Sequence, residues 1–181
     1  MLIEDGKGSG FKAQVTDHNM LKVYAMVETE ISHMSEVHGD AYIWTATADW
    51  GADKNAIWLR NDNADQNLII QSIFIGAAAA AQIEVWVGNG STSAGTAVVG
   101  TNLNRQSGKV AQATCKHTNT NLNAGGSTTL LGTMYAPATN RLPIDFMGAL
   151  VLGYYDEVSV NIITDVGSTS VNIMGYFHTV D

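Results

Sequence analysis

The sequence predicts an all-β fold, a β-sandwich, and three observations carry this prediction. Apolar residues alternate with polar ones in short runs, clusters of Gly, Asn, Asp and Ser separate the runs, and about ten such runs follow one another. A chain of 181 residues fits one sandwich, because all-β domains of this length often stay undivided. This many short strands favours a jelly-roll arrangement.

Three runs show the alternation most clearly: 82–87, 158–163 and 171–178. Each reads as a strand with one face on a core and the other face in a more polar setting. The run 68–75 is apolar on both faces, as in a central strand that is covered on each side. Further strands are expected at 12–16, 20–27, 42–47, 56–60, 128–133 and 149–153.

The segments between these runs are less regular. Residues 17–19 separate two strand-like runs and are expected to form a hairpin loop. Residues 27–38 carry no clean apolar stripe, so we expect a linker with at most a turn of helix. Residues 77–81 are too short for an independent helix and should continue a strand or form a tight bend. The predicted organisation is an extended N-terminal arm or linker with a hairpin (1–40), packed on the sandwich or on a neighbouring subunit, followed by the sandwich (41–181).

Composition excludes several classes of partner. The chain has 17 acidic and 9 basic residues and a formal charge of −8, which argues against nucleic-acid binding. No segment approaches the roughly 20 apolar residues of a membrane span. The pair Glu4-Asp5 stands where a signal peptide would carry basic charge, so we expect synthesis in the cytoplasm without export by the usual route. Cys115 is the only cysteine, and we interpret it as a small, partly buried apolar residue.

The low charge density points to assembly. Charged residues make up 14% of the chain, whereas soluble domains usually contain about 25%. The surface must therefore be rich in small polar and apolar side chains, and surfaces depleted in charge resemble buried interfaces. We expect a protein that assembles with other copies.

No arrangement of residues predicts an enzyme, a cofactor or a metal site. Gly6-Lys7-Gly8-Ser9-Gly10 lacks the preceding buried strand and the following helix of a phosphate loop. His33 and His38 are five residues apart, so they are not expected to share a helical face as an i, i+4 zinc pair does. A polar interface segment is the better interpretation of these two histidines. No serine stands in a Gly-x-Ser-x-Gly nucleophile elbow.

Trp86 leaves two interpretations open. It lies on the strand face opposite Ile83, Val85 and Val87. It could pack in a second core or a subunit contact, where aromatic residues are enriched, and this interpretation is favoured. Alternatively, an exposed ring on a β-sandwich could stack on a sugar.

A front pattern and an internal motif together cover about a third of the chain: Ile3 to Gly10, Ala13, Val15, Asn19, Leu21, Val23, His33, Ser35, His38-Gly39-Asp40-Ala41-Tyr42, then Asn102 to Gly108, Ala111 and Ala113. In these two parts the chain resembles a group of tailed-bacteriophage virion proteins. The resemblance implies a capsid-associated sandwich, a head decoration or cement protein. Such proteins commonly act as trimers that clamp neighbouring capsid subunits, and no catalytic residue follows from the likeness.

These expectations define a hypothesis. The chain is a structural protein on the capsid surface of a virion, and its partners are the major capsid protein and other copies of itself, as a homotrimer. The expected interface residues are Ile3, Lys7, Phe11, Lys12, Tyr24, His33 and His38. The alternative is a tail- or fibre-associated protein that binds a host-surface glycan through exposed aromatic residues, Trp86 first among them.

Overall fold

A computed structural model describes the backbone of residues 2–4, 12–15 and 21–22, and residues 29–89, 95–117, 128–164 and 167–179 in full. The three front strands are β1 (Leu2–Glu4), β2 (Lys12–Val15) and β3 (Leu21–Lys22). They form an antiparallel sheet of their own, in the order β1-β2-β3. β2 and β3 pair as the strand–turn–strand pattern predicts, and the turn itself (16–20) lies outside the described residues.

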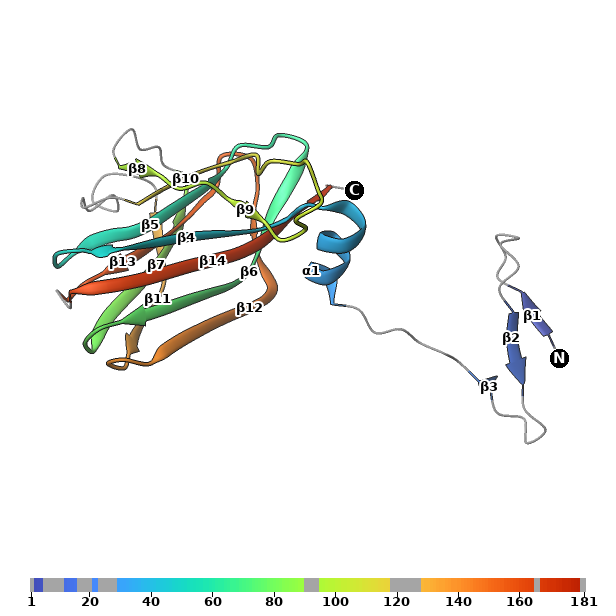
Figure 1. The fold of residues 1–181 in the computed structure, drawn as a ribbon, viewed down its shortest axis with the longest axis horizontal. Coiled ribbons are helices and arrows are strands. Elements are labelled where there is room, and N and C mark those ends of the chain that lie inside the picture. Colours follow the sequence, from blue (N-terminus) through green and yellow to red (C-terminus); the bar gives the residue numbers. More distant parts are fainter. Residues whose placement is uncertain are drawn as a thin grey trace.

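The rest of the chain is a sandwich of two antiparallel sheets (Figure 1). The first, here called the β13 sheet, has the order β11 (Thr128–Ala136), β7 (Ala81–Gly88), β13 (Glu157–Ile162), β5 (Lys54–Asn61), β10 (Ala113–His117), β8 (Thr96–Ala97). The second, the β14 sheet, has the order β12 (Arg141–Leu152), β6 (Gln66–Ala77), β14 (Ser168–Thr179), β4 (Ala41–Asp49), β9 (Thr101–Asn102).

The strand order is that of a jelly roll. Successive strands β4, β5, β6 and β7 alternate between the two sheets, and so do β11, β12, β13 and β14 in the return direction. Each sheet therefore contains two strands from the outward path interleaved with two from the return path, which is the pattern of two Greek keys. The predicted fold class is confirmed.

The core lies between the two sheets and is made by the inward members of the alternating runs. Trp44 and Ile73 from the β14 sheet and Ile57, Leu59 and Val160 from the β13 sheet are completely buried in it. Burying side chains of this size contributes about 1.5–3 kcal/mol each relative to leaving them exposed. The period-two pattern in the sequence is thus the pattern of this core.

The two long edges of the sandwich differ. On one edge the segment 95–117 runs from the β13 sheet to the β14 sheet, because β10 pairs with β5 and β9 pairs with β4. On the opposite edge lie β11 and β12, which pair only with β7 and β6 among the described strands. Figure 1 shows β8, β9 and β10 along the upper edge and β11 and β12 along the lower one.

A short helical segment covers the outer face of the β14 sheet. It consists of an α-helical turn, α1 (Glu30–His33), followed by a π-helical turn, η1 (Met34–His38). Met34 is buried against Ala41 and Tyr176, with Ile31 and Ile69 packed beside them. Residues 30–40 therefore pack on the sandwich, although no apolar stripe in the sequence predicts a helix there.

The structure extends several predicted strands. β12 begins at Arg141, eight residues before the predicted 149–153 run, and β10 was not predicted. Residues 78–80 form a bend between β6 and β7, which is one of the two outcomes expected for 77–81. β13 differs from its prediction, because every residue in it is buried, including Ser159 and Asn161 on its outer face.

Candidate functional surfaces

The expected interface residues are described only in part. Ile3 lies in β1 and Lys12 in β2, and their side chains are outside the described residues, as are Lys7, Phe11 and Tyr24 altogether. His33 and His38 are described and exposed. The arm as an attachment segment therefore stays a prediction.

The two histidines do share one face of the helical segment, contrary to the prediction from their spacing. Their rings meet edge to face with centroids 5.2 Å apart. The prediction assumed an α-helix, in which residues four apart align. In the π-helical turn η1 the hydrogen bonds run between residues five apart, so His33 and His38 align instead.

The two motifs that carry the phage resemblance contact each other, although about 65 residues separate them in sequence. The side-chain amide of Asn102 donates to the carbonyl oxygen of Gly39 at 2.8 Å, and the hydroxyl of Ser107 donates to the same oxygen at 3.2 Å. The amide of Asn104 donates to the carbonyl of Ser35 at 3.0 Å. These bonds tie the loop after β9 to the end of η1.

Gly39 suits this contact in two ways. Its φ is +62°, a conformation that side chains with a Cβ adopt at a cost. A Cβ built on Gly39 would lie 2.5 Å from the hydroxyl oxygen of Ser107. The two motifs thus form one structural unit, which holds the helical segment on the sandwich.

Asp40, the next residue, has its side chain in the same unit. Its carboxylate pairs with the ammonium group of Lys109, and its backbone carbonyl accepts from the amide of Phe177 at 3.0 Å. The Tyr42 hydroxyl donates to Asp40 at 3.5 Å. Burial, with the negative charge of Asp40, raises the pKa of Tyr42 to about 12. Asp40, Lys109 and Phe177 also line a hollow of about 470 Å³ at this end of the sandwich.

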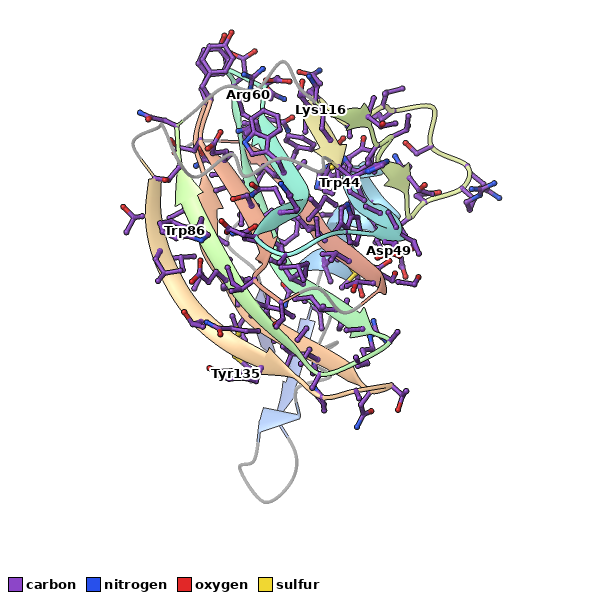
Figure 2. All side chains as sticks on the ribbon, turned by 90° about the vertical axis from the view of Figure 1, so that its left-hand side faces the viewer. Trp44, Asp49, Arg60, Trp86, Lys116 and Tyr135 are labelled. Atoms are coloured by element: carbon purple, nitrogen blue, oxygen red, sulfur yellow. The ribbon has the colours of Figure 1, made fainter. Side chains whose placement is uncertain are left out.

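Trp86 belongs to a row of side chains across the outer face of the β13 sheet. Ser159 in β13 stands opposite Trp58 on one side and Trp86 on the other. Lys116 stands opposite Trp58, and Leu130 opposite Trp86. Figure 2 looks onto this sheet, with Trp86 near its left side and Arg60 and Lys116 at its upper end. Two indole rings thus flank the centre of the face.

The two indoles differ in exposure. Trp58 is 1% exposed, and its Nε1 donates to the carboxylate of Glu157 at 2.7 Å. Trp86 is half-buried, and its Nε1 donates to Glu84 at 2.9 Å. A ligand cannot stack on the Trp58 ring, and only part of the Trp86 ring is open to one. The packing interpretation of Trp86 therefore fits the geometry better than the glycan interpretation does.

The edge formed by β11 and β12 carries several of the exposed large apolar side chains of the described residues, and the sequence did not predict it. β11 contains no charged residue, and β12 contains only Arg141 and Asp145. The exposed apolar side chains on this edge include Tyr135, which is 72% exposed and labelled in Figure 2, and Met147, which is 84% exposed; the others are Leu130, Leu131 and Val151.

Other kinds of site find little support in the described part of the chain. There, no three His, Cys, Asp or Glu side chains are grouped so as to hold a metal ion. Neither of the described helical turns is long and apolar enough to cross a membrane. Comparisons with protein families, with curated proteins and with solved structures find no match for this chain. Function is therefore inferred from the surface of the jelly roll.

Proposed function

We propose that this protein is a structural component of a tailed-bacteriophage virion, a head decoration or cement protein that binds the capsid shell as an oligomer. The observation that carries the proposal is the β11–β12 edge, which exposes several apolar side chains and in which β11 has no charged residue. Proteins usually protect exposed sheet edges with lysine, proline, bulges or a covering segment. Here the segment 95–117 covers one edge. On the other edge both strands shift register and β12 contains Pro143, but β11 carries no charged residue.

The partner proposed for this edge is another copy of the same chain. Copies that each carry a charge of −8 repel one another, and they can approach most easily through a surface without charge. The backbone groups on the outer side of β11 can also extend the β13 sheet into a neighbouring copy. The jelly roll agrees with this proposal, because viral capsid domains use it, although the same fold also serves lectins.

The attachment to the major capsid protein is assigned to the front arm. Its expected contacts are Ile3, Lys7, Phe11, Lys12 and Tyr24. Many modest contacts, repeated by each subunit of a trimer, add up by avidity and need no chemistry. Deleting residues 2–16 should abolish binding to capsids while circular dichroism and the unfolding midpoint of the sandwich stay unchanged. Full decoration by the shortened protein would overturn the role of the arm.

The oligomer is tested separately, on the full chain. Leu131→Lys places a charge in β11, which has none, and Val99→Lys makes the same change at an exposed residue of the edge that the segment 95–117 covers. Sedimentation equilibrium should give a trimer for the wild type and for Val99→Lys, and a monomer for Leu131→Lys. A monomeric wild type, or equal masses for both variants, would refute assembly through this edge.

A further inference from the structure

Four planar side chains are stacked from the β13 sheet out to the surface at one end of the sandwich. The guanidinium carbon of Arg60 lies 5.4 Å from the ring centre of Trp58 and 4.9 Å from that of Tyr155. The Tyr154 and Tyr155 rings are stacked with centroids 3.9 Å apart and planes at 29°. Because Tyr154 occupies one face of Tyr155, Arg60 takes the other, and Tyr154 ends the stack.

The inner members of the stack are held firmly. Trp58 is buried and bonded to Glu157, and the Arg60 side chain is about one-fifth exposed and bonded through Nε to Asp62 at 2.7 Å. Tyr154, by contrast, is 50% exposed. Its hydroxyl interacts with that of Tyr155, and this hydrogen bond raises the pKa of Tyr154. The stack therefore presents the outer part of one aromatic ring on a fixed support.

The turn that carries the two tyrosines is rigid and strained. Tyr155 has a φ of +65°, which a residue with a large side chain rarely adopts. Its amide donates to the carbonyl of Asn61 at 2.8 Å, and the side chain and amide of Asp156 both bond to Gly153 at 3.0 Å. Backbone strain of this kind concentrates at ligand-binding positions, where the surrounding structure holds it in place.

A hollow of about 330 Å³ begins beside this turn. Leu152 and Asp156, which flank the two tyrosines, line it. Asn89 and Glu157 add an amide and a second carboxylate, and Leu150 adds an apolar wall. Binding sites for small molecules combine such an apolar surface with a few polar groups that fix the orientation. An aromatic platform and a polar hollow thus share one turn.

We propose that Tyr154 and the hollow beside it form a binding site for a neutral oligosaccharide. The C–H groups on the less polar face of a hexose carry partial positive charge, and the face of an aromatic ring carries partial negative charge, so the two attract. The hydroxyl groups at the edge of the sugar donate hydrogen bonds to carboxylates such as Asp156. A sugar bound on the open face of the Tyr154 ring would therefore form a fifth layer on the stack of four side chains.

The charges around the platform decide the ligand class. Asp62 and Arg60 act on Tyr154 with opposite signs and pair with each other, so the net charge near the site comes from Asp156 and Glu157, which line the hollow. These charges disfavour an acidic saccharide and leave neutral sugars as the fitting class. The inference does not depend on a place in a virion, but Thr129 and Val151, which also line the hollow, belong to the edge proposed to contact another copy. The residue proposed to contact a glycan is therefore Tyr154 and not Trp86, whose ring is partly covered.

The test measures binding of the full-length protein to maltohexaose, cellohexaose and a galactotetraose by NMR titration, with tetragalacturonate as the acidic comparison. At least one neutral oligosaccharide should bind, and tetragalacturonate should bind more weakly. Tyr154→Ala should weaken binding at least about tenfold, because one stacked layer is lost. Tyr154→Phe keeps the ring and should keep most of the affinity. Val99→Ala, at an exposed residue of the opposite, covered edge, is the control and should bind like the wild type.

Three results would overturn the proposal. The first is that none of the three neutral oligosaccharides binds. The second is that Tyr154→Ala binds as tightly as the wild type, or that Trp86→Ala loses binding in its place. The third is that Tyr154→Ala weakens attachment to capsids while no sugar binds, which would make the stack a contact between proteins. Backbone amide spectra of each variant report whether the fold is intact, so a loss of binding is assigned to the ring alone.

Discussion

The side-chain amide of Asn102 donates to the carbonyl oxygen of Gly39, and this bond joins two motifs that are far apart in the sequence. The same amide also donates to the backbone carbonyl of Lys109 at 3.2 Å, and the side-chain carbonyl of Asn102 accepts from the backbone amide of Asn104 at 2.8 Å. One asparagine thus fixes the loop after β9 and the end of η1 together.

Replacing this asparagine should destabilise the protein. Asn102→Ala removes three hydrogen bonds and leaves the Gly39 region with fewer partners, so we expect a loss of about 2 kcal/mol in the free energy of unfolding. Urea unfolding of the two proteins measures it. Asn140→Ala, at an exposed turn between β11 and β12, is the control and should change stability by less than about 0.5 kcal/mol. Equal effects of both variants would contradict the structural unit.

Gly39→Ala should be more harmful than an ordinary glycine replacement. The left-handed backbone disfavours alanine by about 1 kcal/mol, and the added methyl group collides with Ser107. We expect a total loss of about 2 kcal/mol or more, measured by thermal unfolding. Gly39→Ala combined with Ser107→Gly relieves the collision but not the backbone strain. Ser107→Gly alone loses the hydrogen bonds of its hydroxyl, so the test compares backgrounds: Gly39→Ala should cost less in the Ser107→Gly protein than in the wild type, and an equal cost in both would refute this explanation.

The two tryptophans of the β13 sheet allow a matched comparison. Trp58→Phe and Trp86→Phe each remove one indole N–H that donates to a glutamate. Trp58 is buried, so its replacement also leaves a gap and removes a hydrogen bond to a buried carboxylate, at a cost of about 2–3 kcal/mol. Trp86 is half-buried, and its replacement should cost about 1 kcal/mol or less. Chemical denaturation would contradict this arrangement if Trp86→Phe were the more damaging change.

Cys115 should be unreactive in the folded protein. Its side chain is buried in the core, and burial raises the pKa of the thiol, so little reactive thiolate forms at neutral pH. A thiol reagent such as Ellman's reagent should give no signal at pH 8 until the protein is unfolded, and one equivalent afterwards. The single cysteine makes the signal assignable. Rapid reaction of the native protein would show that the β10–β5 pair opens easily.

Stability should fall in alkali because of Tyr42. The pKa of this hydroxyl is raised from 10.0 to about 12 in the folded chain, by burial first and by Asp40 second. The folded state therefore holds a proton that the unfolded state releases, so the contribution is complete below pH 10 and is lost as the pH rises towards 12. Tyr42→Phe lacks this proton, and its urea midpoint should fall less between pH 9 and pH 11.5 than the wild-type midpoint does. Parallel decreases in the two proteins would exclude Tyr42 as the cause.

The strands could be predicted from the sequence wherever alternation of apolar residues follows the core. Ile83 and Val85 point into the core and Glu84 points out, as their spacing predicts. The first half of β12 escaped prediction because Pro143 interrupts the pattern and Met147 and Gly148, both with positive φ, form a bulge that shifts it. Local spacing carries no sign of such a bulge.

The sites were harder to predict than the strands. Ser159 is buried on an outer face because two indoles from neighbouring strands flank it, and that neighbourhood exists only once the sheet is assembled. The π-helical turn that aligns His33 and His38 has no sequence signature that distinguishes it from an α-helix. Tyr155 adopts its left-handed conformation without the glycine that usually signals one. The Tyr154 platform therefore depends on contacts between distant strands.

The ion pair between Glu30 and His178, at 3.7 Å, has a consequence for engineering. It brings the beginning of the helical segment beside the end of β14, as Figure 1 also shows. A short peptide could therefore join the two ends, and new ends could be opened in the 78–80 bend between β6 and β7 without cutting a strand. Such a circular permutant omits the front arm and carries a fused cargo at the end of the jelly roll opposite the helical segment.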